Sequence, residues 1–138
     1  MEPALVDIHA YRGGGPLVDG PSYFEDYDYS SATFTMEVRR QADDPLSALI
    51  VLTNAAPTAE GVSCTYTAPV AATEFTPAEP GTSAVVIRIN ETTLEGLPKS
   101  SPAGGDVELV YALDIAGGGH PKQRRMRGKF ILHAGENA

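Results

Sequence analysis

The sequence predicts an all-β fold, an antiparallel β-sandwich or barrel of about seven short strands, and three observations support this. Apolar and polar residues alternate in several short stretches, as they do in strands that bury one face. Clusters of Gly, Pro, Asn, Asp and Ser separate these stretches, and these residue types are typical of turns. The chain has 138 residues, enough for one domain with a core of its own, so we expect a single domain over 1–138.

The clearest alternation lies in SATFTMEVR (31–39), which places Ala32, Phe34, Met36 and Val38 on one face of a strand. The same period predicts further strands at 4–11, 61–67, 83–90, 106–115 and 125–132. The continuous apolar run ALIVLT (48–53) predicts a central strand that is covered on both faces.

Two of these strands carry residues of special interest. In GVSCTYT the alternation places Cys64 on the apolar face, together with Val62 and Tyr66. In RMRGKFIL it sends Arg125, Arg127 and Lys129 to one side of the strand.

The remaining segments are expected to connect the strands. NETTLEGLP (90–98) predicts one short helical turn near 92–97, capped by Thr92 or Thr93 and ended by Pro98. Residues 12–31 form a long acidic loop in this prediction, and the glycine-rich 116–121 forms a hairpin turn.

The formal net charge of −8 argues against a nucleic-acid partner, because phosphate binding requires concentrated positive charge. No apolar run approaches the ~20 residues of a spanning helix. The N-terminal MEPALVDIHAY has an acidic residue where a signal peptide carries Lys or Arg, and no long apolar stretch follows. We therefore expect a soluble protein with neither nucleic acid nor membrane among its partners.

The charge is unevenly distributed along the chain. Half of the ten basic residues lie within eight positions: Lys122, Arg124, Arg125, Arg127 and Lys129. The rest of the chain has five basic residues against eighteen acidic ones, a net charge of −13. The common explanation for such a basic run is a solvated or edge strand, on which charge discourages aggregation.

A second interpretation is an interface. The segment YFEDYDY (23–29) combines acidic and aromatic residues, and aromatic residues are enriched at interfaces. The basic strand of one copy would then meet this acidic region of an identical neighbour, and a closed ring would follow if the rotation closes. The residues of this hypothetical interface are Tyr23, Phe24, Asp26, Tyr27, Arg124, Arg125, Arg127 and Lys129.

Catalytic, metal and cofactor sites are not predicted. Cys64 is the only cysteine, so an internal disulfide is excluded, and a buried cysteine is more often packing than nucleophile. His9, His120 and His133 are far apart in the sequence, with no metal-binding spacing. The glycine triplets lack the helix and the Lys-Ser/Thr pair of a phosphate-binding loop. We expect no enzymatic activity and no cofactor.

The order of the motifs resembles a family of small phage-encoded immunoglobulin-like β-sandwich domains from tail, baseplate and tail-fibre proteins, also found in prophages. The segments that carry the resemblance are YDYSSATFTMEVR, LSALIVLT, AVVIRINETTLEGLP, VELVYALDIAGGG and RRMRGKFIL, which span roughly residues 28–133. The matching positions are Tyr29, Ala32, Thr33, Phe34, Met36, Val38, Arg39, Thr92, Thr93, Leu94, Pro98, Tyr111, Leu113, Asp114, Gly128 and Phe130.

The resemblance implies an immunoglobulin-like fold and a structural role. The chain would be a virion component, assembled in the bacterial cytoplasm, that docks to other tail or baseplate proteins and forms homo-oligomers. The alternative is a module that binds a carbohydrate or protein of the host surface through loops such as 12–31 and 116–121.

Overall fold

The computed structural model describes residues 4–41, 47–98 and 105–133, and it confirms the predicted all-β sandwich. The strands are β1 (Ala4–Leu5), β2 (Ile8–Tyr11), β3 (Leu17–Glu25), β4 (Thr33–Arg39), β5 (Ile50–Leu52), β6 (Gly61–Thr67), β7 (Thr82–Ile89), β8 (Val107–Gly117) and β9 (His120–His133). Parts of the predicted connectors at 41–45 and 96–106, and both ends of the predicted domain, lie outside the described residues.

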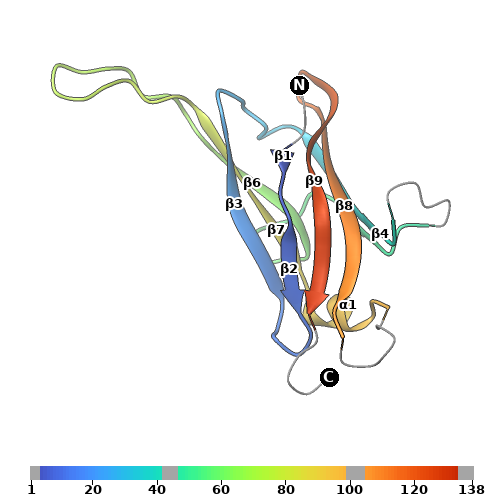
Figure 1. The fold of residues 1–138 in the computed structure, drawn as a ribbon. Helices are drawn as coiled ribbons and strands as arrows, with labels where there is room; N and C mark the ends of the chain where they lie inside the picture. Colours follow the sequence, from blue (N-terminus) through green and yellow to red (C-terminus); the bar gives the residue numbers. More distant parts are fainter. Residues whose placement is uncertain (1–3, 42–46, 99–104, 134–138) are drawn as a thin grey trace.

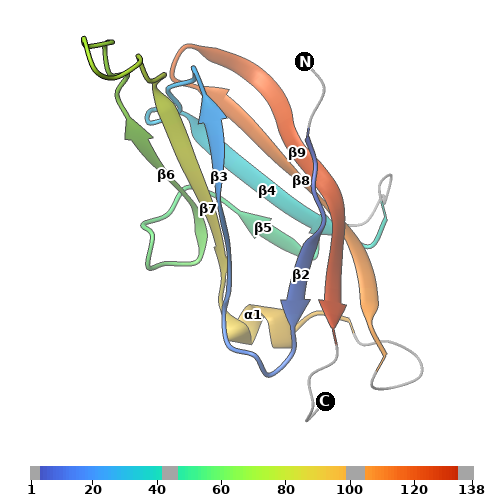
Figure 2. The same ribbon diagram turned by 60° about the vertical axis from the view of Figure 1, so that its left-hand side comes forward.

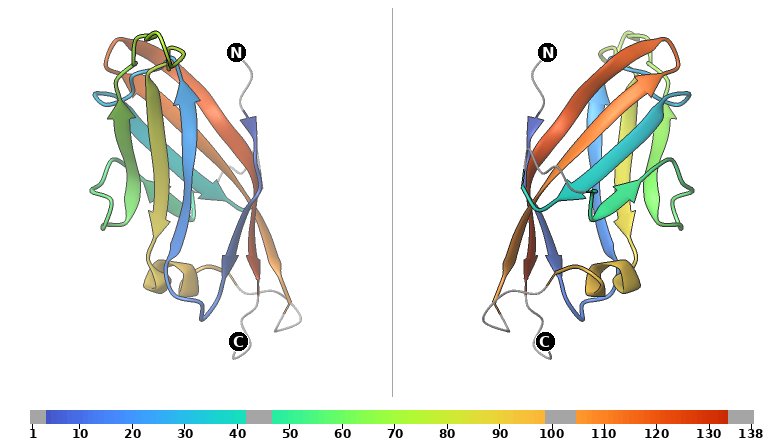
Figure 3. Two further views of the ribbon diagram at one scale, coloured as in Figure 1. Left: turned by 90° about the vertical axis from the view of Figure 1, so that its left-hand side faces the viewer. Right: turned by 90° about the vertical axis from the view of Figure 1, so that its right-hand side faces the viewer.

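The strands form two packed sheets (Figure 1). The larger has the order β1-β9-β8-β4-β5, with β2 also paired to β9, and the smaller has the order β3-β7-β6. The pairs that β1 and β2 make with β9 are parallel, and the other described strand pairs are antiparallel. In the left half of Figure 3 the three-stranded sheet lies in front of the six-stranded one.

The alternation predicted in 31–39, 83–90 and 106–115 is confirmed, because every second residue of β4, β7 and β8 is buried. The two inner faces meet in one apolar core. Its largest fully buried side chains are Tyr29, Phe34, Phe130, Ile8, Met36, Ile87, Ile89, Leu94, Leu113, Ile115, Leu132 and Val38.

The prediction of a long loop over 12–31 is wrong, because Leu17–Glu25 forms strand β3 and pairs with β7. Gly20 and Pro21 interrupt the strand with a register shift between Asp19 and Ser22, and in the sequence they look like a turn. Proline is tolerated here because β3 is an edge strand, where a missing N–H donor breaks no ladder.

The prediction of a central strand at 48–53, covered on both faces, is also wrong. β5 is the edge strand of the larger sheet, with Ile50 and Leu52 buried and Val51 57 % exposed. The predicted N-terminal strand at 4–11 is divided into β1 and β2, and these pair with different parts of β9.

The prediction that Arg125 shares one side of the strand with Arg127 and Lys129 is wrong, because β9 contains a bulge. Leu113 pairs with Met126 while Asp114 pairs with Arg124, which leaves Arg125 as the extra residue. The bulge turns Arg125 toward the inside of the sandwich, where its guanidinium lies 5.0 Å from the ring centre of Phe24. Arg125 is thereby separated from Arg127 and Lys129, which are exposed.

The short helical turn is confirmed as α1 (Glu91–Glu95), but its predicted caps are wrong. The N-cap residue is Asn90, and its own side chain makes no capping hydrogen bond. The carboxylate of Glu60 binds this end of the helix, accepting hydrogen bonds from the Asn90 N–H and the Thr93 hydroxyl, each at 2.7 Å. α1 lies across the lower end of the sandwich, beside the loop from β2 to β3 (Figure 2).

The residue that faces the other end of α1 is Arg12, in this loop. Its guanidinium donates to the carbonyl oxygens of Leu97 (3.0 Å), Pro98 (2.7 Å) and Glu95 (3.3 Å). Glu95 is the last residue of α1, and the last carbonyls of a helix have no partner within it. Leu97 and Pro98 follow the helix, so Arg12 caps the end of α1 together with the segment that leaves it. Its side chain is only 8 % exposed.

Among the described residues, no helix has the length and apolar character required to span a membrane.

Candidate interaction surfaces

The aromatic half of the predicted interface is largely part of the domain's own packing. Phe24 belongs to the core, and Tyr27 stacks on the buried Tyr29 with ring centres 5.4 Å apart. The guanidinium of Arg125 covers the Tyr27 ring at 4.8 Å, a cation–π geometry. Tyr23 is different, because it is 66 % exposed on β3. Arg125, from the basic half of the predicted interface, therefore contacts Phe24 and Tyr27, from its acidic half, within one chain.

A buried serine fixes the acidic segment to the sandwich. The Ser83 hydroxyl, on β7, accepts a hydrogen bond from the Tyr29 N–H at 2.9 Å and donates one to the Tyr27 carbonyl at 2.8 Å. His120, the first residue of β9, adds a contact, with Nε2 2.8 Å from the Asp28 carbonyl oxygen. Burial raises the pKa of the Tyr29 hydroxyl, which keeps it neutral among these rings.

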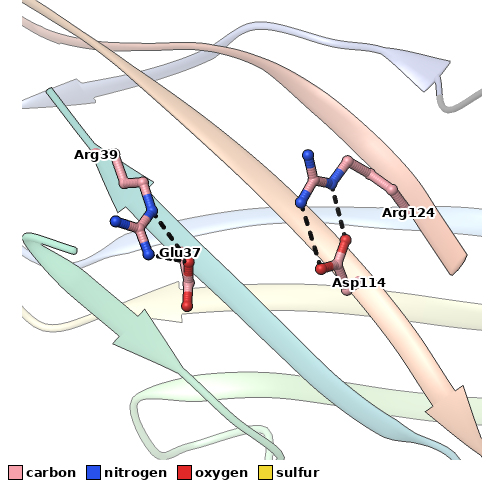
Figure 4. A network of polar contacts seen from close by, with 4 residues as sticks. All are labelled: Glu37, Arg39, Asp114 and Arg124. Atoms are coloured by element: carbon pink, nitrogen blue, oxygen red, sulfur yellow. Dashed lines mark hydrogen bonds and ion pairs between the residues drawn. The ribbon is translucent and has the colours of Figure 1, made fainter. Parts of the chain in front are cut away.

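Without Arg125, the basic half of the predicted interface lies on the outer face of the six-stranded sheet, where Figure 4 shows Arg124. Arg124 donates to the Asp114 carboxylate at 2.9 Å, and this bond raises the pKa of the guanidinium. Arg39 pairs with Glu37 at 2.7 Å on the neighbouring strand β4. Lys129 lies 3.2 Å from Glu108. Among the described residues, Arg127 has no ion-pair partner.

A shallow hollow of about 550 Å³ lies on this same face. Its apolar lining comes from Leu5, Val110 and Ala112, and Leu5 is 74 % exposed. Its charged lining consists of Glu37, Arg39, Arg124 and Arg127, and Tyr111 and Gly128 complete it. A hollow with an exposed leucine and an excess of arginine fits a ligand or partner that is both apolar and acidic.

Residues 68–80, between β6 and β7, form an arm that the sequence did not predict. Every residue of the arm is exposed, and its two sides are joined by a bridge between Val70 and Glu79 and by hydrogen bonds between Thr73 and Thr76 at the tip. It projects well beyond the sandwich (Figure 1). Phe75, at its tip, is 89 % exposed. The sequence predicted only a connector here because three prolines break any alternation.

The three histidines were expected to lie apart, but two of them, His9 and His133, are in contact. β2 pairs in parallel with the last part of β9, and His9 Nδ1 lies 2.8 Å from His133 Nε2. The other ring nitrogen of His133 lies 3.0 Å from the Asp106 carboxylate, and Tyr11 stacks on the His133 ring. Among the described residues, no group of three His, Cys, Asp or Glu side chains is arranged to hold a metal ion.

Cys64 is half-buried against the core, which agrees with the predicted face. Burial raises the pKa of its thiol. Because the thiolate is the nucleophilic form of cysteine, this shift reduces its reactivity at neutral pH.

Asp19 lies on β3 opposite Ile87, and its side chain therefore points toward the interior of the sandwich. Burial raises its pKa above the ordinary value of 3.8. A carboxyl whose folded-state pKa is raised favours the folded state when it is protonated and opposes it when it is ionised. We expect Asp19→Asn to raise the Tm at pH 7, with the gain shrinking as the pH falls through the raised pKa toward 3.8, measured by thermal unfolding between pH 7 and pH 3.

Asp28 provides a control for the Asp19 prediction, because its pKa is shifted in the opposite direction. Two hydrogen bonds from Ser30 lower the pKa of Asp28, so its contribution to stability is present at neutral pH and is lost as the pH falls. Asp28→Asn should lower the Tm at pH 7 and have little effect in acid. An equal Tm gain from Asp19→Asn at pH 3 and pH 7 would show that its charge is not the cause.

The comparisons with known proteins add no family. No model of a known protein family matches the chain, and no curated protein matches it significantly. The fold and surfaces define a two-sheet β-sandwich with a projecting hairpin arm and a charged hollow on its outer face.

Proposed function

We propose that the chain is a non-enzymatic structural protein of a bacteriophage virion, an attachment and assembly module of a tail, baseplate or tail fibre. It is assembled in the cytoplasm of the bacterial host and works by binding copies of itself and other virion proteins. The observation that carries the proposal is the arm at 68–80, which presents an exposed Phe75 beyond the body of the domain.

The arm supports this proposal because it contributes no side chain to the core of its own domain. Ordering thirteen residues costs conformational entropy, which is not offset here by burial within the same chain. Exposed apolar surface of this kind is typical of protein–protein contact sites. The resemblance over residues 28–133 to immunoglobulin-like phage domains supplies the particular setting, a tail, baseplate or tail fibre.

The composition agrees with protein partners rather than nucleic acid. The net charge of −8 makes a phosphate backbone an unfavourable partner. Much of the basic run in β9 is neutralised within the chain by Asp114 and Glu108. What remains is local charge, suited to setting the register of a protein–protein contact.

The test is mass spectrometry of particles purified from the strain that encodes the chain, after induction of its prophages. We expect the chain in intact particles at a copy number that matches a symmetric tail or baseplate ring. Particles from a strain in which the gene is deleted are the control, and they should lack the affected substructure in electron micrographs. Absence of the chain from infectious wild-type particles, or its loss without structural effect, would refute the proposal.

A further inference from the structure

We infer that the arm of one copy docks in the hollow on the outer sheet face of a second copy, with Phe75 against Leu5 and the arm's glutamates facing Arg127. This inference rests on the proposed function and identifies one partner, a second copy of this chain. Four observations carry it: how the arm is built, what the hollow lacks, how the charges match and where the arm points.

The arm presents side chains and is poorly suited to pairing with another strand. Pro69, Pro77 and Pro80 remove three backbone donors, which weakens strand addition along its edges. At the tip, the Thr73 N–H donates to the Thr76 carbonyl at 2.9 Å, and the Thr76 N–H donates to the Thr73 hydroxyl at 3.0 Å. This turn fixes the backbone on both sides of Phe75, so less entropy is lost when the ring is bound.

The hollow has the volume and the lining residues to receive this tip. Its volume of about 550 Å³ lies within the range of pockets that bury small ligands. Leu5 is 74 % exposed there and lacks an apolar cover. A phenyl ring placed on Leu5, Val110 and Ala112 would remove apolar surface of both copies from water.

The charges of the two surfaces are complementary. The arm carries Glu74 and Glu79 and no basic residue. The hollow carries Arg39, Arg124 and Arg127 against Glu37. Arg39 and Arg124 have carboxylate partners in the same chain, whereas Arg127 has none among the described residues. An arriving glutamate would therefore pair with Arg127 without breaking an existing ion pair.

The direction of the arm makes the contact intermolecular. The arm leaves the end of the three-stranded sheet and points away from the body (Figure 1), so it lies apart from the outer face of its own six-stranded sheet. A contact between two different surfaces is heterologous, so each copy offers both an arm and a hollow. Repetition of the contact generates a ring if the rotation closes, or a filament if it does not.

The first experiment is sedimentation velocity of the full chain over a range of concentrations. We expect concentration-dependent association that Phe75→Ala weakens by about 30-fold, the effect of a hot-spot residue. Arg127→Glu should weaken it similarly, and Glu74→Lys with Arg127→Glu should restore part of it. Val18→Ala, at an exposed apolar residue of β3, is the control and should leave association unchanged. A wild-type chain that stays monomeric throughout would overturn the inference.

Mixing identifies the pair of surfaces directly. Phe75→Ala retains a working hollow, and Leu5→Asp retains a working arm, so the mixture should form a dimer and nothing larger while each variant alone stays monomeric. In a Cys64→Ala background, Phe75→Cys and Leu5→Cys chains should form a mixed disulfide when combined. Failure of this cross-link in a chain that does associate would show that another contact drives assembly.

The two proposals fail separately. A chain that is present in particles but stays monomeric, or whose Phe75 cross-links only to a different virion protein, refutes the arm-in-hollow contact and leaves the virion role standing. A chain that assembles through Phe75 and Leu5 but is absent from particles refutes the virion role alone.

Discussion

Replacing Arg12 by methionine is expected to lower the free energy of unfolding by about 3 kcal/mol, as is typical for loss of a buried, charge-assisted hydrogen-bond donor. Methionine keeps the unbranched stem but removes the guanidinium that serves the Glu95, Leu97 and Pro98 carbonyls. The bond to the Leu97 carbonyl is buried and the other two are part-buried, and a buried acceptor that loses its donor bears the full cost of desolvation. Chemical denaturation of the wild type and the variant measures this loss.

Two further variants test whether the planar guanidinium of Arg12 at its buried site causes this loss, as opposed to its positive charge alone. Arg12→Lys keeps a positive charge but has no planar pair of nitrogens to reach two carbonyls at once, and we expect it to recover only part of the loss. Arg124→Met makes the same chemical change at an exposed ion pair, and it should cost less than about 1 kcal/mol. A cost at Arg12 no greater than at Arg124 would refute the capping role.

The part of the fold that the sequence predicts is the part determined by local alternation. Phe34, Met36 and Val38 repeat every second residue, and the same period marks β7 and β8, so their buried faces were predicted residue by residue. The all-β class and the glycine turn between β8 and β9 follow from the same kind of local pattern.

The features that were missed depend on partners far away in the sequence. Arg12 meets carbonyls 83 to 86 residues later, and His9 meets His133 across 124 residues, so no window of sequence contains both members. β3 was missed because Gly20 and Pro21 have the composition of a turn. The bulge at Arg125 leaves no mark in the alternation, although it decides which basic residues share a surface.

The same distinction between local pattern and long-range contact applies to the candidate surfaces. The acidic and basic composition of the interface hypothesis was visible in the sequence, but the placement of its members was not. Phe24 and Arg125 are used inside the domain, whereas Arg127 remains on the outer face, beside a hollow that includes Leu5 from the other end of the chain. Only the fold brings Leu5 and Arg127 together.

Gly128, one of the residues that carry the phage resemblance, has a structural reason to be glycine. The chain crosses over it between β1 and β2, where the Val6 N–H donates to the Arg127 carbonyl at 2.9 Å. The Tyr111 hydroxyl donates to the Val6 carbonyl from the other side. A Cβ on Gly128 would lie 2.8 Å from the Val6 carbonyl carbon and 3.1 Å from the Asp7 carboxylate, so the crossing strand would have to move.

We expect Gly128→Ala to lower the free energy of unfolding by about 2 kcal/mol, in the range of overpacked sites. Hydrogen exchange should show lost protection at the Val6 amide, and at the Lys129 amide that donates to Asp7. Gly96→Ala is the control, because Gly96 has a right-handed helical backbone and an added Cβ there meets nothing closer than 3.5 Å. It should be neutral or slightly stabilising.

A double-mutant cycle with Tyr111→Phe separates displacement of the crossing strand from a general loss of stability. Alone, Tyr111→Phe should cost about 1 kcal/mol, because the Val6 carbonyl loses its donor. If Gly128→Ala has already pushed Val6 away, that hydrogen bond is absent in the variant, and removing the hydroxyl should then cost almost nothing further. Fully additive costs would mean that Val6 keeps its place, and that the alanine destabilises the domain by a route other than the crossing strand.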